Sequence, residues 1–423
     1  MTYSRLIAFA ALLLPAASYG QSREPFETSS AGPLLRADVA GSRQPAGLEP
    51  AGVHAGTVLV QPSLSVRAEA DSNVLNRSSS KRGDIYVVFA PAVKASGEAG
   101  RAGYVVQAEA AAARFAKLTS QNSETFGLDG SVRFDVTRNA ALFTRVSFDR
   151  KVEPHSSAGA ASVEGSPAEY DQVEAQIAAR METGSSRFTA SVTATELTYA
   201  DITQTDGTIA DQGFRDTSTL SLALKAEHAV PAGATLFVQG KYNWIDSTHP
   251  DPCCDRSSKG GQALAGIRAD LGKLITAEFA AGYVFRNYDS PGYSDYGGLT
   301  WRARADWYAT PLMSLSLAGG RSIVNSGIRE VPAIIVDTAS VQMFYEVRRN
   351  LNLVLTLART DEDYREASTQ AHTNLIGLES RYIFSSRYAG GAYARYRDRK
   401  SSGGGQLRDG SAIESGLWLR VGI

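Results

Sequence analysis

The feature that most constrains the fold is a regular alternation of two kinds of connection from Thr57 to the C-terminus. Short segments of alternating polarity are joined in turn by very short turns and by long polar loops. A β-strand places successive side chains on opposite faces, so each such segment has one apolar face and one polar face. Strands with these faces and these connections are typical of a transmembrane β-meander.

The two faces differ clearly in the segment from Leu236 to Trp244. Apolar and small residues occupy every second position there, whereas Gln239, Lys241 and Asn243 occupy positions between them. One face suits lipid and the other suits water. The same division recurs in the segments 220–224, 275–283, 301–307 and 351–357.

An open sheet cannot leave its edge groups unpaired in lipid, so these strands must close into a barrel. We expect roughly nine hairpins, and hence about 18 antiparallel strands in up-and-down order with both termini in the periplasm. The predicted periplasmic turns are 138–139, 231–233, 271–273, 310–311, 349–350 and 385–386. The predicted extracellular loops are 69–83, 151–169, 201–212, 248–258, 290–295, 325–333 and 399–410.

Two of the predicted strands, 99–117 and 170–181, have a helical alternative. Both contain alanine and glutamate, which favour helix by intrinsic propensity. In the second segment apolar and polar residues alternate with a period of two, and this pattern favours a strand.

A soluble β-rich protein, such as a periplasmic sandwich or propeller, would also show alternating faces. The sequence contains no repeat of the length of a propeller blade. Tyrosine and tryptophan lie near the predicted strand ends, as at Tyr242, Trp244, Trp307 and Tyr308. Such positions are typical of the interfacial girdles of membrane proteins, so the membrane barrel is favoured.

The N-terminus has the form of an export signal over residues 1–20. Arg5 supplies positive charge, residues 6–17 form a short apolar core, and Ser18 and Gly20 place small residues before the expected cleavage site. We therefore expect cleavage after residue 20 and export from the cytosol to the bacterial outer membrane.

Residues 21–56 are rich in serine, alanine, glycine and proline and have no sustained period, which predicts a flexible periplasmic segment before a barrel over residues 57–423. Beyond the N-terminus, no apolar run approaches the roughly 20 residues that a membrane-spanning helix needs. The chain has 43 basic and 44 acidic residues, so no overall field favours nucleic acid.

The sequence lacks the common hydrolase, nucleotide-binding and zinc signatures, which predicts a protein that is not an enzyme and has no cofactor. One loop, from His249 to Asp255, gathers residues that can bind metals. Its adjacent cysteines and its prolines restrict convergence on one ion, so a metal site is disfavoured. A disulfide between Cys253 and Cys254, the two cysteines of the chain, is the favoured interpretation.

The predicted inward face carries basic residues that are candidate contacts for a polymer or an anion. They are Arg133, Arg145, Lys241, Arg268, Arg286, Arg302, Arg304, Arg395 and Arg397. The predicted inward carboxylates are Asp135, Glu227, Glu278, Asp306 and Glu346. A basic wall would favour anions, including acidic sugar chains, through guanidinium hydrogen bonds. Alternatively, charges of both signs pair across strands and fill the lumen.

Several short motifs resemble a known family, the putative β-barrel porin 2 family. In the first strands these are 61–66, 71–74, 83–84 and 90–91, and later they are 266–271, 281–288, 307–311 and 347–351. The resemblance extends from about Val60 to Ile423. It implies an outer-membrane barrel of about 18 strands. Because many members are encoded beside capsule or exopolysaccharide export machinery, it also implies a route for a sugar polymer.

The last strand alternates Leu417, Leu419, Val421 and Ile423 with Trp418, Arg420 and Gly422. This strand resembles the assembly signal of outer-membrane barrels, although those usually end on an aromatic residue. The barrel assembly machinery is therefore a predicted partner, besides the lipid of the outer membrane.

The function predicted from these features is a passive outer-membrane conduit for a secreted capsular polysaccharide or exopolysaccharide, working with an envelope-spanning export complex. One alternative is a general or substrate-selective porin for small solutes, which would have the same fold. Another is a structural or adhesive barrel whose loops bind a partner.

Overall fold

The structure is a computed structural model that describes residues 51–423 except 159, 161–164, 232, 250–254, 273, 404–406 and 408. The predicted signal peptide, most of the predicted segment 21–56, and both Cys253 and Cys254 lie outside the described residues. The export signal and the disulfide therefore stay predictions.

A single antiparallel sheet closes into a barrel of 18 strands. The strands in the first half are β2 (Val58–Asp71), β3 (Asp84–Ala99), β4 (Ala102–Phe115), β5 (Ser123–Thr137), β6 (Ala140–Glu153), β7 (Ala168–Thr183), β8 (Ser186–Tyr199), β11 (Thr217–Val230) and β12 (Ala234–Ser247). The second half contains β13 (Ser258–Leu271), β14 (Ile275–Tyr288), β15 (Tyr296–Thr310), β16 (Met313–Asn325), β17 (Ala333–Arg348), β18 (Leu351–Tyr364), β19 (Thr369–Ile383), β20 (Tyr388–Ser402) and β21 (Gly410–Gly422).

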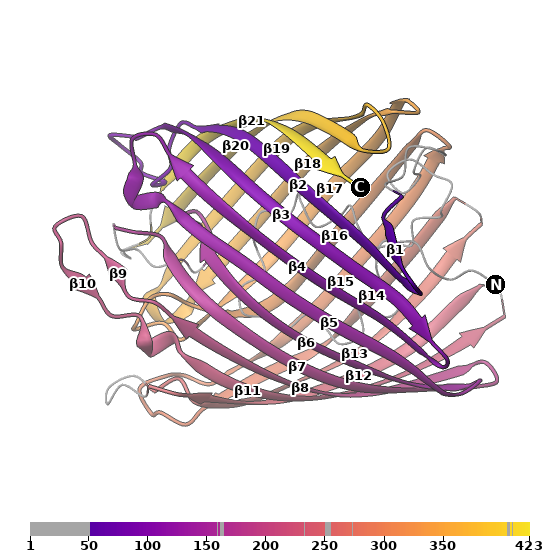
Figure 1. The fold of residues 1–423 in the computed structure, drawn as a ribbon. Helices are drawn as coiled ribbons and strands as arrows, with labels where there is room; N and C mark the ends of the chain where they lie inside the picture. Colours follow the sequence, from indigo (N-terminus) through magenta and orange to yellow (C-terminus); the bar gives the residue numbers. More distant parts are fainter. Residues whose placement is uncertain are drawn as a thin grey trace.

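Each of these strands pairs with its neighbours in chain order, and the ring closes where β2 pairs with β21 (Figure 1). The closing register runs from Ser63 opposite Gly422 to Asp71 opposite Glu414. Closure leaves no open edge in the membrane-spanning part of the sheet. The predicted all-β, up-and-down transmembrane barrel of about 18 strands is confirmed.

Three further short strands lie outside the barrel ring. β1 (Val53–Ala55) pairs with residues 58–60 of β2, beyond the part of β2 that β21 covers. It thereby protects an edge that would otherwise be free. β9 (Ile202–Thr203) and β10 (Ile209–Ala210) form a small hairpin that projects at the left of Figure 1.

Helical structure in the described residues consists of short 3-10 turns within loops: η1 (Thr119–Gln121), η2 (Gly213–Arg215) and η3 (Arg365–Ala367). The described part of the chain has no helix that is long and apolar enough to cross a membrane. The helical alternatives at 99–117 and 170–181 are not formed, because β4 and β7 occupy them. In β7, buried Gln172, Glu174 and Gln176 alternate with exposed Val173, Ala175 and Ile177. Pairing with two neighbouring strands thus overrides helix propensity.

All six predicted short turns lie at one end of the barrel, called here the short-turn end, and the loops lie at the other, the long-loop end. Two further turns, at 99–102 and 183–186, and two further loops, at 116–122 and 365–368, were not predicted. Gly100 and Gly184, with φ of 61° and 56°, supply the left-handed conformation that these two turns need.

The two faces of the wall differ as the alternation predicts. On β12, Val238 is 57% exposed on the outer face, whereas the neighbouring Phe237 and Gln239 are both 4% exposed on the inner face. The register carries this assignment from strand to strand around the barrel. The outer face is therefore largely apolar and the inner face is largely polar.

Candidate functional site

The strand register places all nine predicted basic residues on the inner face of the wall. Most of them form ion pairs with inward carboxylates. The pairs are Arg133–Asp135 (2.8 Å), Arg145–Asp129 (2.5 Å), Arg268–Glu278 (2.6 Å), Arg302–Glu278 (3.3 Å), Arg304–Asp306 (2.9 Å) and Arg397–Glu414 (2.7 Å).

The remaining predicted basic residues have other surroundings. Arg286 donates to Asn325 Oδ1 at 3.1 Å, and the Arg395 guanidinium lies over the ring of Tyr393, 4.7 Å from its centroid. Lys241 is inward-facing and also has a partner. The two predicted carboxylates outside these pairs are Glu227, which binds Lys225 at 3.0 Å, and Glu346, which is buried.

Sequence reasoning missed several inward carboxylates that balance the arginines. They include Glu69, Asp129, Glu379 and Glu414. Their place at the polar positions of strands with alternating polarity is the sequence signal that could have identified them. The paired charges make the wall closer to neutral than the predicted residues alone suggested.

A cavity of about 600 Å³ runs along the inside of the barrel. Its wall is formed by β2 to β5 and β16 to β21, and the loop between β6 and β7 also lines it. Near the long-loop end it is bordered by Glu362 and Val74, and towards the short-turn end by Arg381 and Arg420. Its aromatic lining residues are Tyr86, Phe115, Tyr393 and Trp418.

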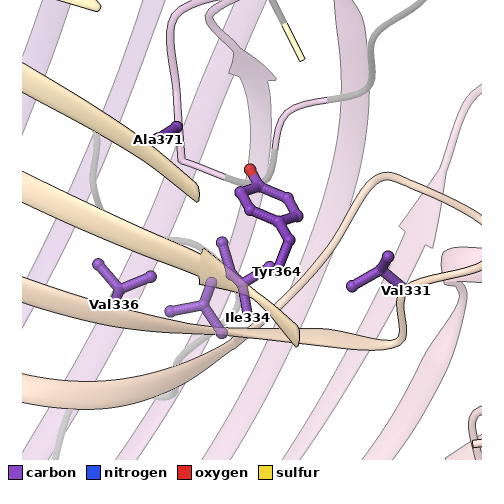
Figure 2. Packing of buried hydrophobic residues seen from close by; sticks show 6 residues of the cluster. Val331, Ile334, Val336, Tyr364 and Ala371 are labelled. Atoms are coloured by element: carbon purple, nitrogen blue, oxygen red, sulfur yellow. The ribbon is translucent and has the colours of Figure 1, made fainter. Parts of the chain in front are cut away.

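The loop between β6 and β7 enters the lumen instead of extending only outwards. Its residues Pro154 to Ala158 line the cavity. Ala158 packs against an apolar cluster on the inner side of β16 to β19, across the barrel from β6. Figure 2 shows this cluster, with Val331, Ile334, Val336, Tyr364 and Ala371 labelled. The sequence predicted an extracellular loop at 151–169 but gave no signal that it folds inwards.

An ion pair anchors the start of this loop. Arg215, in η2, binds Glu153, the last residue of β6, through two hydrogen bonds of 2.8 and 3.1 Å. The Arg215 guanidinium also lies over the ring of Tyr199, with its Cζ 3.9 Å from the centroid. The ion pair crosses β7 and β8, so it ties the loop between β6 and β7 to the loop between β8 and β11.

Hydrogen bonds hold both arms of the inward loop to the neighbouring loops. Gln121, in η1, donates to the Gly165 carbonyl oxygen at 2.7 Å. The Oε1 atom of the same side chain lies 3.0 Å from His155 Nε2. On the other side, the Ser166 N–H donates to the Thr203 carbonyl oxygen at 2.9 Å. The loop is therefore held in the lumen from two directions.

A second network joins loops at the long-loop end. The ring of Phe214 contacts the guanidinium groups of Arg256 and Arg329, whose Cζ atoms are 4.7 and 4.6 Å from the ring centroid. Arg256 donates to the carbonyl oxygens of Ser326 and Ile328 at 2.5 and 2.6 Å. Burial lowers the pKa of Arg256 to about 10, so it remains charged at neutral pH.

No group of three or more His, Cys, Asp and Glu residues that could hold a metal ion occurs among the residues that the structure describes. Most of the loop from His249 to Asp255 lies outside those residues. His249 Nδ1 is 3.1 Å from Asp216 Oδ2.

Solved structures with a similar shape are outer-membrane proteins. OccK2 (OpdF) of Pseudomonas aeruginosa in complex with glucuronate is 11% identical, with a TM-score of 0.49 over 86% of this chain and 98% of that one. OccAB3 of Acinetobacter baumannii is 11% identical, with a TM-score of 0.45 over 86% and 99%. The alcaligin receptor FauA of Bordetella pertussis is 13% identical, with a TM-score of 0.42 over 86% and 76%.

A search of the curated proteins found no match. A family profile described as "Putative beta-barrel porin 2" matches residues 44–420, which is most of the chain and agrees with the motifs noted in the sequence. Together with the closed barrel and its apolar outer face, this match shows that the chain belongs to the putative beta-barrel porin 2 family and is a porin-type barrel of the bacterial outer membrane.

Proposed function

We propose that this barrel is a passive conduit for export of a secreted capsular polysaccharide or exopolysaccharide across the outer membrane. The observation that carries the proposal is the lengthwise cavity, whose lining combines aromatic rings with paired charges and hydroxyl groups. Sugar hydroxyl groups exchange hydrogen bonds with such a lining, and the apolar faces of sugar rings pack against aromatic rings.

A conduit must bind its cargo weakly at several places, because strong binding at one place would stop transport. The paired arginines and carboxylates offer many donors and acceptors without a large net charge. The barrel has no motif for a source of energy, so the polymer would be driven by an envelope-spanning export complex. The barrel assembly machinery would insert the chain into the membrane.

The test is a deletion strain complemented with wild-type protein or with single variants, in which surface polysaccharide is measured. Ala358→Trp adds bulk to the cavity, since Ala358 lines it. The matched control is Leu357→Trp on the same strand, because Leu357 is exposed on the outer face. We expect the deletion and Ala358→Trp to lower surface polymer and Leu357→Trp to restore it. Unchanged polymer in the deletion strain would contradict export.

The inward loop favours a second candidate, a selective porin for small solutes. Ala158 contacts the opposite wall and thereby narrows the path beside it. In that case the deletion strain would keep its surface polymer but take up small solutes more slowly. Ala358→Trp would then lower solute uptake and leave the polymer unchanged.

A further inference from the structure

Two aromatic side chains of the cavity, Tyr393 and Trp418, pack closely over glycines of the wall. A Cβ atom on Gly416 would be 2.8 Å from Tyr393 Cε1, and one on Gly391 would be 2.8 Å from Trp418 Nε1. A larger residue at Gly416 would collide with the tyrosine ring, and one at Gly391 would collide with both the Ser380 carbonyl oxygen and the indole. Both rings are only partly buried, and both line the cavity.

The Glu69 carboxylate lies near Tyr393. It accepts a hydrogen bond of 2.6 Å from the hydroxyl of Tyr86. Arg67 Nε lies 3.1 Å from the same carboxylate. These contacts surround the polar end of the Tyr393 side chain, while the Arg395 guanidinium lies over its ring.

Arg395 continues this surface towards the long-loop end. Its side chain lies over Gly377, where a Cβ atom would be 3.3 Å from Arg395 Cγ. The neighbouring arginines of the cavity wall have carboxylate partners, as in Arg397–Glu414 at 2.7 Å and Arg381–Glu379 at 2.6 Å. Within the described part of the chain, by contrast, Arg395 has no carboxylate oxygen within 4.0 Å and stacks on Tyr393.

The three side chains form one continuous track along the barrel. Arg395, Tyr393 and Gly391 are successive inward positions of β20, and Gly391 is paired with Trp418. From the strand rise, the track from Arg395 to the level of Trp418 is about 13 Å long. We call this surface, Arg395 with Tyr393 and Trp418, the aromatic–arginine track.

We infer that the aromatic–arginine track binds an acidic saccharide, a chain of sugar rings that carry carboxylates. The apolar C–H face of a pyranose packs on an aromatic ring, and a guanidinium binds a carboxylate through two hydrogen bonds. A sugar ring stacked on Trp418 would bring a carboxylate further along the chain within reach of Arg395, which lies over the ring of Tyr393. The inference rests on the proposed saccharide cargo and specifies its chemical class.

Trp418 also provides a direct reporter of binding. The chain has four tryptophans, and Trp244, Trp301 and Trp307 share the outer face of the wall. Trp418 lines the cavity. A change in tryptophan emission on adding a water-soluble sugar would therefore come from the lumen.

The experiment titrates the purified full-length barrel in detergent with oligogalacturonate and, separately, with a neutral galactose oligomer of equal length. We expect the uronate to bind more tightly and to change tryptophan emission. Arg395→Gln should weaken uronate binding about tenfold and leave the neutral sugar nearly unaffected, because a charge-assisted hydrogen bond is lost. Trp418→Phe should remove the emission change. Arg359→Gln, on the outer face and paired with Asp361 at 2.7 Å, is the matched control.

Equal binding of the two sugars, or uronate binding that Arg395→Gln leaves unchanged, would overturn the inference. Direct calorimetry of each variant distinguishes lost binding from a lost optical signal, and the heat-dependent mobility of the barrel on gels shows that each variant is folded. The outcome is separable from that of the proposed function. If the barrel binds the uronate but the deletion strain has unchanged surface polymer, the aromatic–arginine track is supported and the export function is contradicted. If the deletion strain loses surface polymer but the barrel does not bind the uronate, export is supported and the aromatic–arginine track is contradicted.

Discussion

Arg215 donates two hydrogen bonds to Glu153, and the two side chains are only 3% and 2% exposed. The pair joins the last residue of β6 to a different loop, at the point where the chain turns into the lumen. A buried ion pair gives little net stability, but removing one partner leaves the other charge buried without compensation. The position of the inward loop should therefore depend strongly on this contact.

Glu153→Ala should destabilise the anchored loop by about 3–5 kcal/mol, because Arg215 is left buried and unpaired. Single-channel recording in planar bilayers should then show larger and more variable conductance. Replacing Arg215 by methionine as well should recover part of the loss. Glu196→Ala, at an exposed position on the outer face of β8, is the control. Wild-type conductance in Glu153→Ala would show that the ion pair does not hold the loop.

Ala158→Asp should displace the inward loop from the opposite wall. Its carboxylate would enter the apolar cluster of Val331, Ile334 and Tyr364, where an unpaired charge costs several kcal/mol. Conductance should rise, and protease should cut the loop faster in intact barrels. Thr205→Asp, in the exposed β9–β10 hairpin, provides a control in another loop. If both variants behave alike, Ala158 does not form the constriction.

Arg397→Gln should shift the ion selectivity of the pore towards cations, because Glu414 loses its partner at 2.7 Å. The double variant with Glu414→Gln should return the selectivity close to that of the wild type. Reversal potentials in a salt gradient measure both effects, and the double-mutant cycle isolates the coupling of the pair. If the single and the double variant lose anion selectivity to the same extent, Arg397 instead contacts permeating anions directly.

Acid should loosen the loop network around Arg329. The N–H of Gly213 and the guanidinium of Arg329 hydrogen-bond Asp211 at 2.9 Å each and hold the pKa of this carboxyl below its ordinary value. A lowered carboxyl pKa means that the stabilising contact is complete above about pH 4 and is lost as pH falls through the lowered pKa. Current noise should thus rise only below about pH 4. In Asp211→Asn the current noise should be high already at neutral pH. Equal noise in the wild type and in this variant at neutral pH would show that the contact between Asp211 and Arg329 does not restrain the loops.

Much of the fold was predictable because its signals are local. A period of two fixes which residues share a face, and it correctly placed Gln239 and Lys241 inside and Val238 outside. Turn residues such as Thr310 and Pro311 marked the hairpins, and closure followed from the need to pair every strand edge in lipid. The polar alternation also assigned Arg395 and Arg397 to the lumen.

The details of the lumen depended on residues that are far apart in the sequence. Nothing near Ala158 predicts its packing against the apolar cluster on the opposite wall, and nothing near Glu153 identifies Arg215 as its partner. Trp418 lies on the polar face of the last strand in the sequence pattern, but only the strand register shows that Gly391 lies opposite it and leaves room for its side chain. The sequence by itself determined the strands, their faces and the barrel, since these follow from local periodicity and the solvent on each side. Only the tertiary structure decided which charges pair and which loop enters the lumen, because those contacts form when distant strands are brought side by side.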